Sequence, residues 1–196
     1  MKLERTTIKT IITMQKHIAS KDVYRSSLTS VILKNDTLYA TNGYKAIRYN
    51  IFPSTNTNTN TLGLVKDKVD SFDAANRAQL ELLLKASSKH QNIFELTNGL
   101  HFSDDEKVTS ILIKTESIDR IFSNDTGETY NSDNNRLILP SNVMPEIALN
   151  AEYLSDIAQV LGDNLRINMI KPLTFKITPH DAIKYSGEAI LCGLRN

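Results

Sequence analysis

Residues 31–49 contain a run of short β-strands, and this run constrains the fold more than any other stretch of the chain. An apolar segment beginning at Val31 leads into the polar turn Lys34-Asn35-Asp36, and a second alternating segment leads into Asn42-Gly43. Both Asn and Gly tolerate positive φ, so Asn-Gly between alternating segments is typical of a tight hairpin turn. The sequence predicts strands over Ser26–Leu33, Thr37–Thr41 and Lys45–Phe52.

A helix followed by strands is predicted three times along the chain. Apolar residues recur at helical spacing over Thr7–Ala19, Asp73–Ser87 and Asn150–Leu161, and Asp73 and Asn150 are good N-cap residues. The strands predicted after the second and third helices are Asn92–Thr97, Leu100–Phe102, Val108–Lys114, Leu165–Met169, Thr174–Thr178 and Glu188–Leu194. Shorter apolar runs precede these helices, at Leu62–Val65, Leu137–Leu139 and Glu146–Leu149. The predicted class is therefore α+β, with a helix packed on an antiparallel sheet and repeated about three times.

Polar stretches indicate where the chain divides. The Asn-Thr run at residues 54–61 has no apolar side chain, which predicts a flexible surface loop. Residues 119–135 are mostly polar and rich in turn residues, which predicts a linker. We therefore predict a domain of two half-units over residues 1–118 and a further half-unit over residues 136–196.

The composition is that of an ordinary globular protein, with 40% apolar and 23% charged residues. No apolar run approaches the length of a membrane-spanning helix, so no membrane partner is expected. Met1–Thr10 lacks the apolar segment of a secretory signal, and we expect the protein to stay in the cytoplasm where it is made.

Candidate catalytic groups are sparse. The single cysteine, Cys192, excludes an internal disulfide and is expected to be a small buried residue. The histidines are scattered, and no phosphate-binding loop or nucleophile–base set is recognisable, so we expect no metal, no cofactor and no enzyme activity. The alternative is a Mg²⁺-dependent nuclease that uses Asp104-Asp105-Glu106, although a hairpin turn is expected to expose these carboxylates to water.

Charge is distributed unevenly although the formal net charge is only +1. Residues 1–114 contain 16 Lys and Arg against 11 Asp and Glu, whereas residues 115–196 contain 7 against 11. A mildly basic first part suits local attraction to DNA. An ordinary surface asymmetry explains the same counts equally well.

The hexapeptide Ala40–Lys45, which reads ATNGYK, resembles the ATDGHR signature of the bacterial β sliding clamp. Leu149–Leu154 is similar to that family's F-N-x-x-Y-L helix start, and Gly162–Ile167 to the strand that follows. Lys171-Pro172-Leu173 resembles a D/G-P-L turn, and Leu191–Asn196 resembles the family's terminal M-P-M-R-L. The resemblance covers residues 7–52 and 146–196, and the middle of the chain only by the order of its elements.

This resemblance implies a DNA sliding clamp, a processivity factor whose helices line a ring around double-stranded DNA and whose surface pocket captures peptides of a DNA polymerase. The family closes its ring with twelve half-units, so three half-units per chain imply a homotetramer, with a trimer as the alternative. A compact chain of this kind suits a viral protein in an infected bacterial cell. An adaptor or decoy that binds replication proteins without encircling DNA is the competing interpretation.

The resemblance also assigns site residues. The DNA-binding candidates lie on helix faces away from the apolar stripe: Lys9, Lys16, Arg77 and Lys85. Ordinary solvated helix charges are the alternative for each of them. Glu152 and Asp156 on the third helix would repel phosphate. The peptide pocket is implied to contain Thr41, Gly43, Tyr44, Lys45, Ala46, Ile190, Cys192 and Leu194. For Ile190 and Leu194, a simple core position is the alternative.

Overall fold

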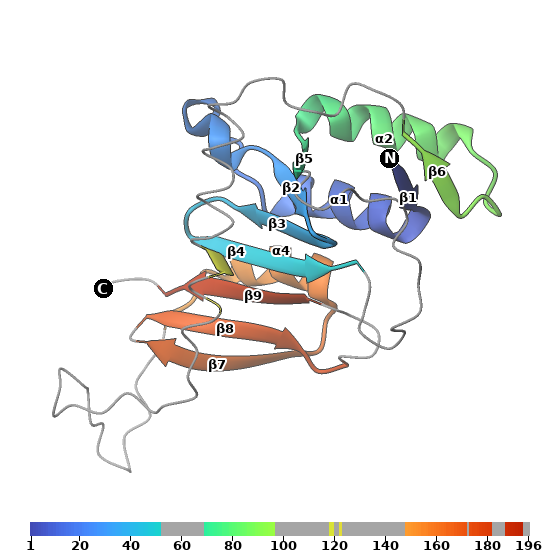
Figure 1. The fold of residues 1–196 in the computed structure, drawn as a ribbon. Coiled ribbons are helices and arrows are strands. Elements are labelled where there is room, and N and C mark those ends of the chain that lie inside the picture. The colour runs from blue at the N-terminus through green and yellow to red at the C-terminus, as the bar shows by residue number, and fades with distance from the viewer. Residues whose placement is uncertain are drawn as a thin grey trace, which may run out of the picture.

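Helices lie against antiparallel strands throughout the part of the chain that the structure describes (Figure 1). The structure is a computed structural model, and it describes residues 1–51, 69–96, 118–119, 122, 148–171, 173–181 and 187–193. The helices are α1 (Arg5–His17), α2 (Ala74–Ala86) and α4 (Ala151–Leu161), with a short 3₁₀ helix, η1, at Val23–Leu28. The strands are β1 (Lys2–Glu4), β2 (Val31–Lys34), β3 (Thr37–Thr41), β4 (Lys45–Asn50), β5 (Val69–Phe72), β6 (Ile93–Glu95), β7 (Leu165–Lys171), β8 (Thr174–Pro179) and β9 (Gly187–Cys192).

The caps predicted for the second and third helices are confirmed. At α2, the Asp73 carboxylate accepts a hydrogen bond from the Asn76 backbone N–H at 2.9 Å, and the Asn76 side chain accepts one from the Asp73 N–H. At α4, the Asn150 side chain accepts from the N–H groups of Glu152 and Tyr153. These bonds satisfy donors that have no partner inside the helix, so they set where each helix begins.

Seven strands form one sheet, in the order β5-β2-β3-β4-β9-β8-β7. The junction between the first and third helix-plus-strands units is the β4–β9 pair, which is antiparallel from Lys45 opposite Leu191 to Tyr49 opposite Gly187. Two units far apart in the sequence therefore share a single sheet. Most of the predicted linker at residues 119–135 lies outside the described residues, so the division into 1–118 and 136–196 stays a prediction.

The first two units exchange the strands that lead into their helices. Strand β1 leads into α1 but pairs with β6, which follows α2. Strand β5 leads into α2 but pairs with β2, which follows α1. Each unit therefore completes the other, and α1 packs against α2.

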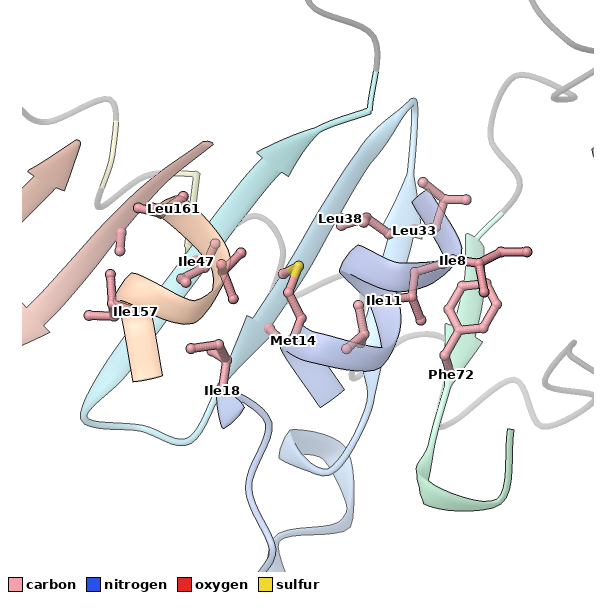
Figure 2. Close-up of a cluster of buried hydrophobic side chains, with 14 of the residues drawn as sticks. Ile8, Ile11, Met14, Ile18, Leu33, Leu38, Ile47, Phe72, Ile157 and Leu161 are labelled. Carbon is pink, nitrogen blue, oxygen red and sulfur yellow. The ribbon is translucent and has the colours of Figure 1, made fainter. Parts of the chain in front are cut away.

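The main core lies between the helices and one face of the sheet (Figure 2). Helix α1 contributes Ile8, Ile11 and Met14, while α4 contributes Ile157 and Leu161, and all of these side chains are buried. These helix side chains pack in one cluster with the strand residues Leu33, Leu38, Ile47, Phe72, Ile177, Ala189 and Leu191. Because one cluster contains residues of both units, α1 and α4 cover the same face side by side.

The opposite face of the sheet carries a smaller apolar cluster. Ile32, Tyr39, Ala46 and Ile190 are buried there together with Ile118 and Phe122. The Tyr39 hydroxyl donates a hydrogen bond to Asp119 at 3.1 Å. Burial, together with the negative charge of Asp119 and this hydrogen bond, raises the pKa of Tyr39 to about 12.

Two predicted strands are wrong in part. Residues 26–28 of the predicted strand Ser26–Leu33 belong to the 3₁₀ helix η1, and only Val31–Lys34 is a strand. Ser20 and Asp22 accept hydrogen bonds from the backbone N–H groups of Asp22 and Tyr24, so local side-chain bonds favour a turn there. Ala148 and Leu149, at the end of the predicted strand Glu146–Leu149, are irregular because Asn150 caps α4.

Several predicted features lie outside the described residues: the loop at 54–61, the runs Leu62–Val65 and Leu137–Leu139, the strands Leu100–Phe102 and Val108–Lys114, and the cluster Asp104-Asp105-Glu106. Within the described ranges, no helix combines the length and the apolar character needed to cross a membrane.

Candidate functional site

The turn between β3 and β4 carries the hexapeptide and is held by a dense set of hydrogen bonds. The Asn42 side-chain oxygen accepts from the backbone N–H groups of Tyr44 and Lys45, both at 3.0 Å. The Thr41 hydroxyl donates to the Lys45 carbonyl at 2.8 Å and accepts from the Gly43 N–H at 3.0 Å. Gly43 has φ of +94°, which a residue with a Cβ adopts only with strain. These hydrogen bonds stabilise the turn, and the residue types at Thr41, Asn42 and Gly43 explain its backbone conformation.

The turn lies directly beside the last strand. Lys45 and Ala46 stand opposite Leu191 and Ile190, and the Cys192 backbone N–H donates to the Tyr44 carbonyl at 2.9 Å. The hexapeptide and the end of β9 therefore lie side by side in the sheet.

An ion pair between a buried lysine and a half-buried aspartate joins this turn to α4. The Lys45 side chain is only 2% exposed, and its Nζ donates to Asp156 Oδ2. His17 Nδ1, at the end of α1, lies 3.0 Å from Asp156 Oδ1. The Lys45 ammonium also sits 4.7 Å from the centre of the Tyr153 ring, a cation–π distance. The cluster Lys45–Asp156–His17 therefore ties both helices to the turn.

The electrostatics of this cluster favour a charged Asp156. Burial alone would raise the pKa of its carboxyl group. The hydrogen bonds and positive charges of Lys45 and His17 outweigh that effect and hold the pKa of Asp156 below its ordinary value. The sequence predicts that Asp156 faces DNA and repels phosphate, but its carboxylate instead pairs with Lys45 and His17.

An open pocket of about 370 Å³ lies on the helix side of the turn. Tyr44 and Tyr153 form one wall, with their rings stacked at 6.1 Å between centroids. The remaining lining residues come from the turn, from the end of α1 and the segment after it, and from α4: His17, Ala19, Ser20, Lys21, Asp22, Arg25, Asn42, Lys45, Glu152 and Asp156. Cations and carboxylates both line this pocket, so it suits a peptide with an aromatic or apolar anchor and polar flanks better than a small anion.

The predicted pocket residues differ in how accessible they are. Gly43, Tyr44 and Cys192 are exposed, and Thr41 is half-buried. Lys45, Ala46 and Ile190 are buried, and of these three only Lys45 lines the pocket, because Ala46 and Ile190 belong to the apolar cluster on the opposite face of the sheet. The sequence predicts a buried Cys192, and that prediction is wrong. Leu194 lies outside the described residues.

Sequence reasoning missed the contribution of His17, Tyr153 and Asp156 to this site. Tyr153 lies within the helix start Leu149–Leu154, so the resemblance carried a signal for it. Nothing local in the sequence indicates that Asp156 meets Lys45, because 111 positions separate them.

The predicted DNA-binding side chains are in different environments. Lys9 and Lys16 are exposed on α1, and Lys85 is exposed near the end of α2. Arg77 is half-buried instead, because its Nη1 donates to the Gln15 side chain at 3.0 Å and its Nε lies 3.8 Å from Glu81. Arg77 therefore connects α2 to α1. On α4, Glu152 is exposed. No cluster of potential metal-binding side chains occurs in the described ranges.

Known proteins resemble this chain in fold but not in sequence. No protein-family model matches the chain, and no curated protein is similar to it in sequence. Solved structures do match along its whole length. The β chain of DNA polymerase III from Streptococcus pneumoniae matches with a TM-score of 0.52 and 16% identity. A sliding clamp (DNA polymerase III subunit β) from Bartonella birtlesii, bound to griselimycin, matches with a TM-score of 0.56 and 15% identity. The subunit β from Borrelia burgdorferi, in complex with a natural product, matches with a TM-score of 0.56 and 12% identity.

The chain spans 64% of the length of the Streptococcus and Borrelia proteins and 66% of the Bartonella protein. At these identities the likeness is one of fold. The chain thus has the sliding-clamp fold of bacterial DNA polymerase III β subunits.

Proposed function

We propose that this protein is a DNA sliding clamp, which encircles duplex DNA without cutting it or reading its sequence and tethers a DNA polymerase through a peptide pocket. The arrangement of the first and third units is the main support for this proposal. The β4–β9 junction joins two helix-plus-strands units into one sheet, and α1 and α4 lie side by side on the same face of it (Figure 1). A ring needs such units to repeat with their helices turned toward the same side.

The helix side offers contacts of the kind that sliding requires. A clamp must hold phosphates through long, mobile cations and must avoid contacts that specify a base. Lys9 and Lys16 are exposed on α1, and Lys85 is exposed on α2. Glu152 is exposed on α4, so attraction is concentrated on the first two helices. Arg77 supports the packing of α1 against α2 and is the weakest of the four candidates.

Charge removal tests this DNA-facing surface. We expect Lys9→Gln/Lys16→Gln to weaken binding to a DNA circle, and to reduce the slope of log binding constant against log salt by about 0.9 for each phosphate that the protein no longer neutralises. Lys34→Gln/Arg166→Gln is the matched control, because both residues lie on strands whose pairing directs them to the opposite face of the sheet. An equal fall in affinity in both double variants would contradict the placement of DNA against α1.

Peptide capture is the second part of the proposal. Asn42 and Lys45 of the turn, the stacked pair Tyr44–Tyr153, and residues at the end of α1 and just after it surround the pocket. An aromatic or leucine side chain of a polymerase tail would be desolvated against the two tyrosine rings, while Lys21, Arg25 and Glu152 would orient its polar flanks. Tyr44→Ala should weaken binding of such a peptide while leaving DNA binding unchanged.

The competing function is an adaptor that binds replication proteins without encircling DNA. The pocket serves both functions equally, so the distinction depends on assembly. If the ring contains twelve half-units, a chain with three half-units forms a homotetramer, and the alternative is a trimer. Light scattering across a concentration series separates the two functions: a stable closed oligomer favours the clamp, whereas a monomer at high concentration favours the adaptor.

A further inference from the structure

Two side chains from one short stretch of the chain pack on the outer face of the sheet, which is the face opposite α1 and α4. Ile118 and Phe122 are both helical, and they are 6% and 3% exposed. They are four positions apart, so they lie on the same side of a helical turn. The strand residues that receive them come from β2, β3, β4 and β9: Ile32, Tyr39, Ala46 and Ile190. A pair of apolar anchors at this spacing is typical of a short helix bound in a groove.

Polar contacts at the edge of this outer groove select the side chains that it holds. Arg48 Nη1 donates to Asp119 Oδ1 at 3.2 Å, and the same guanidinium lies 4.5 Å from the centre of the Phe122 ring. The Tyr39 hydroxyl donates to Asp119 Oδ2 at 3.1 Å. Arg48 is held in place by Glu188, the residue opposite it on β9. The outer groove therefore recognises a carboxylate and, three residues later, an aromatic ring.

The contacts that hold these residues are as modest as those of a ligand. The side chains of Arg48 and Asp119 are 33% and 39% exposed, and an ion pair that water reaches contributes little to binding. A single helical turn is also marginal in water without the surface on which it docks. The docking therefore depends mainly on burying Ile118 and Phe122 against the strands. A second peptide with the same side chains would compete for the outer groove through the same contacts.

We propose that Ile118, Asp119 and Phe122 act as an intramolecular ligand that keeps the outer groove closed. A partner peptide opens it by displacing them, and this peptide carries an apolar, an acidic and an aromatic residue at the same spacing. Such a contact is autoinhibitory, because the chain competes with its own partner. The outer groove shares no residue with the pocket beside Tyr44 and Tyr153. The inference therefore depends neither on that pocket nor on DNA binding.

The test is the affinity of the full chain for its own segment, supplied as a synthetic peptide with the sequence of residues 116–124. Phe122→Ala should bind this peptide about tenfold more tightly than the wild-type chain, because the wild type must first release its own side chains. Asp119→Asn should give a smaller gain, since it removes only the carboxylate that Arg48 and Tyr39 hold. Circular dichroism checks that both variants fold. A peptide with alanine in place of the phenylalanine should bind neither chain.

Further substitutions in the Phe122→Ala chain locate the bound peptide. Arg48→Met should remove most of the gained affinity, because it deletes the contact to both the carboxylate and the ring. Arg166→Met is the matched control: this arginine is exposed on the same face of the sheet, and its loss should leave the affinity unchanged. Equal affinity of the wild-type and Phe122→Ala chains would overturn the proposal. So would a loss of binding on Tyr44→Ala, since the peptide would then occupy the other pocket.

A fluorescent reporter measures the displacement itself. The chain contains no tryptophan, so Phe122→Trp places a single indole in the outer groove. Saturating peptide should shift its emission to longer wavelength as the indole leaves the apolar groove for water. Unchanged emission at saturating peptide would overturn the proposal. Release of the protein from circular DNA would contradict the sliding function alone and would leave these binding results as they stand.

Discussion

At the scale of single residues, the cluster Lys45–Asp156–His17 determines how the site is held. A buried ammonium needs a counter-ion, and Asp156 supplies it across 111 positions of sequence. His17 contacts the other carboxylate oxygen, so one side chain of α4 is fixed by the turn and by α1 at once. The geometry of the pocket wall at Tyr153 follows from this anchoring, because Lys45 also lies against that ring.

Asp156→Asn should destabilise the fold by about 3 kcal/mol, since it leaves the Lys45 ammonium buried without a negative partner. Urea unfolding followed by circular dichroism measures this change. Adding Lys45→Met to the same chain should recover part of the stability, because it removes the unpaired charge. The exposed substitution Lys9→Met serves as a control and should change stability by no more than about 0.5 kcal/mol.

The lowered pKa of Asp156 also predicts how stability depends on pH. Its carboxyl group titrates lower in the folded chain than in the unfolded chain, so ionisation of Asp156 stabilises the fold at neutral pH. That contribution should be fully present above about pH 4, and it should disappear as the pH falls toward the folded-state pKa. We expect Asp156→Asn to show a shallower acid decline than the wild-type chain. Parallel declines for both proteins would show that Asp156 does not contribute.

At the scale of elements, the hexapeptide turn explains why a short motif can position a pocket. Gly43 takes a backbone conformation that favours glycine, and Asn42 bonds two backbone N–H groups of the same turn. The turn then pairs with β9 through Lys45 and Ala46. The conformation of the turn is therefore set by its own residues, and its position in the fold is set by the pairing of β4 with β9.

Gly43→Ala should cost about 1–2 kcal/mol because of its positive φ, and its Cβ would also lie 3.3 Å from the Arg25 guanidinium. We expect this variant to weaken peptide capture more than DNA binding, since Arg25 and Tyr44 both line the pocket. Calorimetric titration with a polymerase-derived peptide measures the first effect. Asn92→Ala, at an exposed site outside the pocket, should leave peptide affinity unchanged.

Local chemistry explains which elements the sequence predicts well. The caps at Asp73 and Asn150 and the turn at Asn42-Gly43 depend on neighbours within three positions, and each is observed as predicted. The strand predicted from Ser26 is wrong in its first part because Ser20 and Asp22 stabilise a competing turn. The partnership of Lys45 with Asp156 depends on the β4–β9 pairing, which no local pattern of residues specifies. Only the resemblance indicates that the hexapeptide lies near the last strand.

At the scale of the whole molecule, the chain has the sliding-clamp fold in a form that matches about two-thirds of each larger bacterial protein. Units one and two complete each other by exchanging strands, while unit three joins unit one edge to edge. The proposed ring follows from that arrangement together with the lysines exposed on α1 and α2.

Retention on closed DNA circles tests the central claim most directly. The assembled protein is mixed with nicked circular plasmid, together with a loading factor if the ring does not open unaided, and is washed at a salt concentration that removes nonspecifically bound protein. The plasmid is then cut once. We predict that the protein stays on the circle and is released after the single cut, because a ring leaves only over a free end. Equal release from circular and linear DNA would contradict the proposal that this protein encircles DNA.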